Sequence, residues 1–103
     1  MKLITKAIRA KLPKLYATEH DSDPVVHLKL FTPWTSWTWF ITELDDDEDI
    51  AFGYAHNGAA PNSAELGYTS LEELRDVTGP GGLRIERDLH WVPRPLSEAK
   101  TTL

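Results

Sequence analysis

The chain has 103 residues, of which 41% are hydrophobic and 26% are charged, a composition typical of a globular protein large enough to bury one core. We expect a single domain over residues 1–103, with frayed ends at residues 1–2 and 97–103. The absence of cysteine excludes disulfides and thiolate chemistry and suits a reducing compartment. The formal net charge of −5 argues against a nucleic-acid partner, since general nucleic-acid binders carry a basic face.

No apolar run reaches the roughly 18 residues that a membrane span requires, so we expect no membrane association. The amino terminus has the positive charge of a secretory signal but not its apolar segment, because Lys6, Arg9 and Lys11 interrupt it. These features predict a cytoplasmic protein. Local basic charge is confined to residues 2–14.

The first predicted element is a short helix, which Thr5 caps and Pro13 ends, with apolar residues every four positions between them. A polar loop follows at residues 17–24. Alternating apolar residues predict a strand at residues 25–31, and a second strand at residues 37–44 returns beside it as a hairpin.

Two more strands are predicted at residues 50–56 and 64–69, separated by asparagine, glycine and proline residues typical of turns. Ser70 then begins a second helix with the serine–x–x–glutamate pattern of a capping box. The glycine-rich residues 79–82 end that helix, and an edge strand is predicted at residues 83–87. The whole pattern predicts the α+β class: a mostly antiparallel sheet of about four to five strands, with two short helices on one face.

A run of acidic residues joins the second and third predicted strands: Asp45, Asp46, Asp47, Glu48 and Asp49. Its alternating carboxylates copy the first half of a calcium-binding EF-hand loop. The second half fails, because Ile50 and His56 occupy the positions that need glycine and glutamate. We therefore predict a solvated loop and no metal site.

Three tryptophans, Trp34, Trp37 and Trp39, lie close together in the predicted hairpin, and tryptophan is a common anchor of protein interfaces. Trp34 stands beside Pro33 in a turn, where a large side chain is hard to bury. Trp34, Trp37 and the acidic run are therefore the candidate interaction residues.

The densest polar cluster near the carboxyl terminus contains Glu86, Asp88 and His90. Two carboxylates beside a histidine could perform acid–base catalysis if a pocket shifted their pKa values. The simpler interpretation is a set of ion pairs, because no motif supplies a nucleophile, a cofactor or an oxyanion hole. These three residues are catalytic candidates only in the alternative interpretation.

Three segments of the sequence resemble the DUF2958 family of bacterial proteins: the leucine–proline–x–leucine–tyrosine motif at residues 12–16, the tryptophan–threonine–tryptophan motif at residues 37–39, and isoleucine–glutamate–arginine–aspartate at residues 85–88. The family has no established activity and assigns no catalytic residue. Its members recur on plasmids, phages and integrated elements. The resemblance therefore implies a role in transfer or in conflict with a host.

The leading functional hypothesis is a non-enzymatic interaction or modulator protein from a mobile genetic element, acting against host defence and requiring no cofactor. Its partner is an unknown protein, with a basic host protein as the candidate that the acidic run favours. Two alternatives stay open: an enzyme of unrecognised type, and a nucleic-acid accessory protein that uses the basic first helix.

Overall fold

The structure is a computed structural model that describes residues 2–45, 47 and 49–103. Within them the helices are α1 (Lys6–Lys11), α2 (Leu71–Asp76) and α3 (Leu96–Lys100), with 3-10 turns η1 (Pro61–Ser63) and η2 (Pro80–Gly82). The strands are β1 (Val25–Val26), β2 (Leu28–Phe31), β3 (Trp37–Asp45), β4 (Ile50–Asn57), β5 (Glu65–Ser70), β6 (Glu86–Arg87) and β7 (Arg94–Pro95).

Five strands form the main sheet in the order β5-β4-β3-β2-β6, and every neighbouring pair is antiparallel. Strands β1 and β7 form a separate antiparallel pair beside it. This arrangement confirms the predicted α+β class and the mostly antiparallel sheet. The edge strand expected at residues 83–87 is also present, as the short strand β6.

The predicted strand at residues 25–31 is divided at His27 into two strands that belong to different sheets. Leu28 and Leu30 pack into one hydrophobic core, whereas Val26 packs into another. Simple alternation would place all three side chains on one face. The break at His27 lets Val26 reach the opposite face instead.

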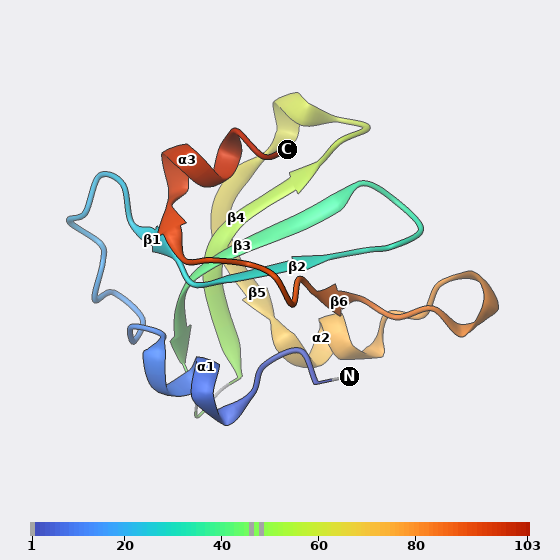
Figure 1. Ribbon diagram of the computed structural model, residues 1–103, viewed down its shortest axis with the longest axis horizontal. Helices are drawn as coiled ribbons and strands as arrows, with labels where there is room; N and C mark the ends of the chain where they lie inside the picture. The colour runs from blue at the N-terminus through green and yellow to red at the C-terminus, as the bar shows by residue number, and fades with distance from the viewer. Residues whose placement is uncertain (1, 46, 48) are drawn as a thin grey trace.

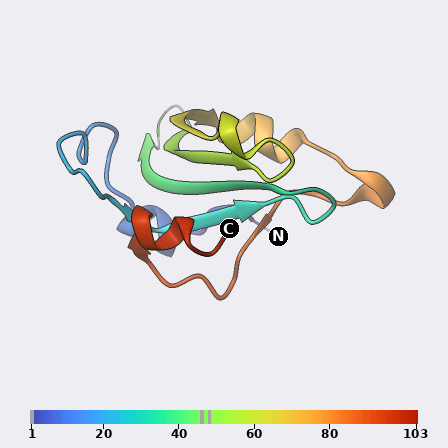
Figure 2. The same cartoon turned by 90° about the horizontal axis from the view of Figure 1, so that it is seen from above.

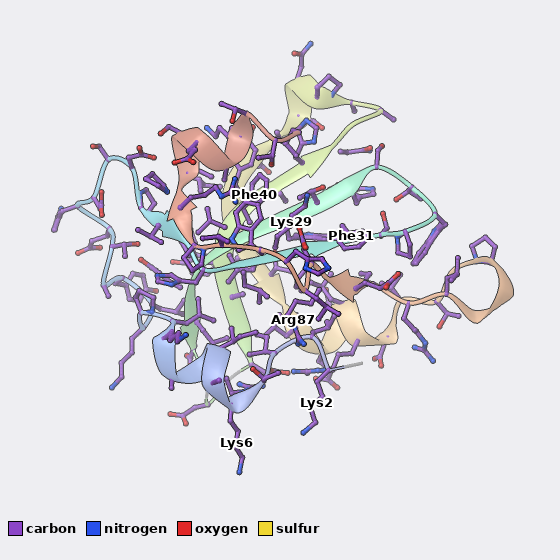
Figure 3. All side chains as sticks on the ribbon, viewed as in Figure 1. Lys2, Lys6, Lys29, Phe31, Phe40 and Arg87 are labelled. Atoms are coloured by element: carbon purple, nitrogen blue, oxygen red, sulfur yellow. The ribbon has the colours of Figure 1, made fainter. Side chains whose placement is uncertain are left out.

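The main sheet is covered on both faces, with α1 and α2 below it and α3 above it in the orientation of Figure 1. The lower core includes Leu28, Leu30, Ile41, Ala51, Leu71 and Leu74, and the upper core consists of Val26, Phe40, Leu96 and Ala99. In Figure 3 Phe40 lies between the sheet and α3. The expectation that the helices share one face was therefore wrong, because the upper face is also apolar.

The helix α3 also corrects the expectation that residues 97–103 are frayed. Leu96 and Ala99, one helical turn apart, are both buried against the upper core. Asp23 contributes from a distant loop, because its carboxylate accepts the Ser97 backbone N–H at 2.8 Å. The helix is thus stabilised by contacts that no local sequence pattern contains.

The register of β3 against β4 shifts between Ile41 and Glu43, so that Thr42 is an extra residue on β3. Such a bulge changes which residues share a face. Phe40 lies on the upper face before the bulge, and Glu43 pairs with Phe52 on that face after it. The bulge therefore brings a carboxylate onto the upper face of an otherwise regular strand.

Both predicted helix caps are present. The Thr5 hydroxyl accepts the Ile8 backbone N–H at 3.2 Å, and the Ser70 hydroxyl accepts the Glu73 backbone N–H at 3.2 Å. Among the described residues, no helix is long and apolar enough to cross a membrane.

Candidate functional site

The two tryptophans predicted to be interaction anchors lie in different environments. Trp34 packs against the lower core, and a Cβ atom placed on Gly79 would lie 2.4 Å from its ring. Its side chain therefore fills space between the β2–β3 turn and the segment after α2. Trp37 is 38% exposed and stacks on Trp39 with ring centroids 5.6 Å apart.

Two residues of the acidic run, Asp49 and Asp45, make contacts within the fold. Asp49 forms a two-pronged ion pair with the Arg75 guanidinium, and Arg9 lies 3.7 Å from the same carboxylate. Asp45 accepts the backbone N–H of Asp47 at 3.0 Å. Asp46 and Glu48, which were also predicted to contribute, lie outside the described residues.

The pKa of the Asp49 carboxyl is lowered from its ordinary value, chiefly because the Arg75 side chain donates hydrogen bonds to it. The same contact raises the pKa of Arg75. The Asp49 side chain is therefore anchored to α2. The sequence had predicted that the whole acidic run is a solvated loop. The run is also at the opposite end of β3 from Trp37, so the two do not form one surface.

The alternative catalytic residues Glu86, Asp88 and His90 line one pocket, together with Lys29 and residues of the β2–β3 hairpin. Its volume is about 500 Å³. The Asp88 carboxylate accepts the His90 backbone N–H at 2.9 Å, which is a turn contact. The structure gathers the three residues but gives no hydrogen bond between their side chains that would pair an acid with a base.

A second exposed feature was not predicted. We call it the open sheet surface, and it consists of Tyr16, Phe52, Leu66 and Tyr68. Leu66 and Tyr68 lie two residues apart on β5 and are 50% and 57% exposed, while Tyr16 is 62% exposed. The Phe52 ring contacts the Tyr68 ring edge to face, with centroids 5.1 Å apart.

The open sheet surface occupies the part of the upper face that α3 leaves uncovered. Viewed from above in Figure 2, α3 lies beside β2, whereas β5 lies at the other side of the sheet. Tyr54, on the neighbouring strand β4, lies under Lys100 of α3 at 4.5 Å from ring centroid to ammonium. That contact marks the boundary between the part of the upper sheet face that α3 covers and the open sheet surface.

Tyr16 reaches the open sheet surface in an unusual backbone conformation, with a φ of 71°. Left-handed backbone is a genuine outlier for a bulky residue and requires support from its surroundings. The support is Glu43, which is only 3% exposed and accepts the Tyr16 backbone N–H at 2.8 Å. The same carboxylate accepts the Thr18 backbone N–H at 2.8 Å and the Thr18 hydroxyl.

The charge around the open sheet surface is negative. The pKa of Tyr68 is raised, first by a hydrogen bond with the Tyr16 side chain and further by the charges of Glu43 and Glu19. Glu65, exposed at the start of β5, points to the opposite side of that strand from Leu66 and Tyr68. The negative charge beside the aromatic rings therefore comes from Glu43 and Glu19.

Part of the open sheet surface could be predicted from the sequence. The alternation of residues 65–68 places Leu66 and Tyr68 on one side of β5, and an edge position would leave them uncovered. The position of Tyr16 could not be predicted from strand alternation, because it depends on a hydrogen bond to Glu43, 27 residues away along the chain. Among the described residues, no group of three or more histidine, aspartate or glutamate side chains could hold a metal ion.

A family model described as "Protein of unknown function (DUF2958)" matches residues 3–100, nearly the whole chain. No curated protein and no solved structure matches the chain. The match confirms the resemblance found in the three sequence segments.

Proposed function

We propose that this chain, which belongs to the DUF2958 family of proteins of unknown function, is a non-enzymatic interaction module that binds a partner protein through the open sheet surface. The observation that carries the proposal is the group of exposed side chains at that surface, Tyr16, Leu66 and Tyr68. Tyrosine combines a large contact area with a polar hydroxyl and few rotatable bonds, which suits it to interfaces.

The strand β5 adds a second reason to expect a partner here. It is an edge strand, and among the described residues no strand pairs with its outer side. Natural edge strands are usually protected by short length, lysine, proline or bulges. β6, at the other edge, is protected by its length of two residues, whereas β5 has six residues and contains neither lysine nor proline.

An open edge of this kind can accept an extended segment of another protein as an additional strand. Main-chain hydrogen bonds would supply affinity, and Leu66 and Tyr68 would contact alternate side chains of the added segment. The charges of Glu19 and Glu43 beside Tyr68 favour a segment that carries lysine or arginine. The partner that fits is therefore a protein with an exposed, basic, extended segment.

The family resemblance supports a further part of the proposal, that the protein originates from a mobile genetic element and acts on a component of host defence. The lack of cysteine supports a cytoplasmic setting for that action. A modulator of this kind needs a rigid surface and no catalytic group, which agrees with a surface built on sheet strands.

The experiment compares three baits in quantitative capture from a bacterial lysate: the parent, the double variant Leu66→Ala/Tyr68→Ala, and Leu89→Ala. Leu89 is a matched control, because it is 64% exposed and lies outside the open sheet surface. Proteins retained by the parent and by Leu89→Ala but lost from the double variant are the expected partners. Each is then purified and its affinity measured by calorimetry.

We expect the double variant to bind the purified partner at least about 30-fold more weakly, which corresponds to about 2 kcal/mol. Circular dichroism should show an unchanged fold, since both side chains are largely exposed. Equal binding by the parent and the double variant would refute the proposal. A lost activity in Glu86→Gln with unchanged binding would favour the enzyme alternative instead.

A further inference from the structure

Below the sheet, the amino-terminal segment, α1, α2 and the segment before β6 enclose a pocket of about 940 Å³. The charged side chains that line it are Lys2, Lys6, Arg9, Arg75, Arg84 and Asp49. The other described lining residues are aliphatic: Leu3, Ile4, Leu74 and Ile85. We call this the basic pocket.

The basic pocket is an exception within an acidic protein. The chain carries a formal net charge of −5 and 11 lysine and arginine residues in total, yet five of the 11 line this one pocket. Only Asp49 opposes them among the described lining residues. A concave site lined by one sign of charge concentrates the field and attracts ligands of the opposite sign.

We propose that the basic pocket binds a ligand that carries two or more phosphate groups. This chemistry is common to the backbone of a nucleic acid and to a free polyphosphorylated nucleotide. The proposed ligand is independent of the partner at the open sheet surface, because the two sites lie on opposite faces of the sheet.

The cationic side chains of the basic pocket differ in their ion-pair and hydrogen-bond partners. Arg75 pairs with Asp49 and also lies in the field of Glu72 and Asp76 on its own helix. Arg84 donates to the Arg75 backbone carbonyl at 3.0 Å, which fixes its guanidinium beside α2.

The side chains of Lys2 and Lys6, by contrast, form no ion pair or hydrogen bond with any described residue. In Figure 3 both side chains extend away from the sheet on its lower side. Arg87 lies above Lys2 in the same view and donates to its backbone carbonyl, which ties the amino-terminal segment to β6. The two lysines are therefore presented from a fixed backbone, and Arg84 provides a guanidinium that matches phosphate geometry.

The composition of the lining indicates phosphate rather than base recognition. The described lining contains no aromatic ring on which a base could stack and no asparagine or glutamine that could read a base edge. Contacts to phosphate position a nucleic acid without reading its sequence. The volume also exceeds the space that a single phosphate needs, which supports a ligand with several charged groups.

The test measures binding to the parent protein of three probes: a labelled single-stranded oligonucleotide of about 12 nucleotides, ATP, and a polyglutamate peptide. The test variant is Lys2→Ala/Lys6→Ala, which removes two exposed charges of the basic pocket without breaking a hydrogen bond. The matched control is Lys11→Ala/Lys14→Ala, because it removes two exposed lysines from the same basic stretch outside the pocket.

We expect the test variant to weaken oligonucleotide or ATP binding at least about tenfold at low salt, while the control changes it less than about threefold. For the oligonucleotide, the slope of affinity against salt should fall by about 1.4, or about 0.7 for each lost phosphate contact. Oligonucleotide binding much tighter than ATP binding identifies the nucleic-acid backbone as the source, and the reverse identifies a free nucleotide.

Three results would overturn the proposal. The first is binding of neither phosphate ligand. The second is equal weakening by the test and control variants, which would reduce the effect to general attraction by the amino terminus. The third is polyglutamate binding as tight as that of the phosphate ligands.

Discussion

The buried carboxylate of Glu43 holds the backbone of Tyr16 in a left-handed conformation and thereby presents the Tyr16 side chain to solvent. One oxygen accepts the Tyr16 N–H, and the other accepts the N–H and the hydroxyl of Thr18. A carboxylate is an acceptor at both oxygens, so it satisfies all three donors without rearrangement. The loop that carries Tyr16 is therefore tied to β3 through Glu43, next to Leu44, whose backbone N–H donates to the Pro13 carbonyl at 2.9 Å.

Replacing Glu43 by glutamine should destabilise the fold by about 2–4 kcal/mol, measured by urea denaturation. The amide keeps one acceptor oxygen but directs an NH₂ group at the donors that the second oxygen served. Glu65→Gln makes the same change at an exposed position and should cost less than about 0.5 kcal/mol. A loss below about 1 kcal/mol in Glu43→Gln would contradict the role assigned to this carboxylate.

Two glycines of paired strands should respond oppositely to alanine. A Cβ atom on Gly53 would lie 1.9 Å from the Phe40 carbonyl oxygen, so Gly53→Ala should cost more than about 2 kcal/mol or prevent folding. Its cross-strand partner Gly67 has no atom within 4 Å of such a Cβ, so Gly67→Ala should be neutral or stabilising by up to about 1 kcal/mol. Similar denaturation midpoints for the two variants would contradict this geometry.

Ser70→Ala should lower the free energy of unfolding by about 1 kcal/mol, because the Ser70 hydroxyl accepts the Glu73 backbone N–H at the start of α2. Ser22→Ala is the matched control, since that serine is exposed and caps no helix. Denaturant midpoints of both variants give the comparison. Equal stability of Ser70→Ala and the parent would remove the capping role.

The ion pair between Asp49 and Arg75 predicts a pH-dependent contribution to stability. The folded state lowers the pKa of Asp49 below its ordinary value of 3.8, chiefly through hydrogen bonds from Arg75. The charged form is therefore favoured in the fold, and its contribution is complete above the unfolded pKa and is lost as the pH falls through the folded pKa.

Asp49→Asn should accordingly be less stable than the parent at neutral pH, and the difference should shrink below about pH 4. Asparagine is the suitable replacement, because it tolerates the φ of 58° at this position. Unfolding measured from pH 7 to pH 2 checks the prediction. The same comparison is then made between Arg75→Gln and the double variant Arg75→Gln/Asp49→Asn. The stability difference between these two proteins should depend less on pH than the difference between the parent and Asp49→Asn. An equal pH dependence would show that a group other than Arg75 is responsible.

The elements that could be predicted from the sequence are those whose signals are local. The caps at Thr5 and Ser70 lie within three residues of the amides that they accept, and the hairpin of β2 and β3 is marked by alternation and a proline turn. Helix α3 was missed for the opposite reason. It begins after Pro95, which offers no side-chain cap, and the carboxylate that serves its first turn comes from Asp23.

The candidate site was less accessible to prediction than the fold. Strand alternation predicts that Leu66 and Tyr68 share one face of the sheet. It does not predict whether a helix covers that face. The basic pocket combines Lys6 from a basic stretch that was recognised with Arg75 and Arg84, which come from distant segments. Spacing along the chain contains no signal for such a combination, since it depends on how α2 packs against the amino terminus.

The two-sided covering of the sheet also fixes the order in which the molecule can be completed during synthesis. Strands β2 to β5 follow one another along the chain and can pair as successive hairpins, whereas β6, β7 and α3 are translated after them. Until Leu96 and Ala99 leave the ribosome, the upper side of Phe40 has no cover from α3. During synthesis the sheet therefore forms with an exposed apolar upper face, which α3 covers only when residues 96–100 have been added.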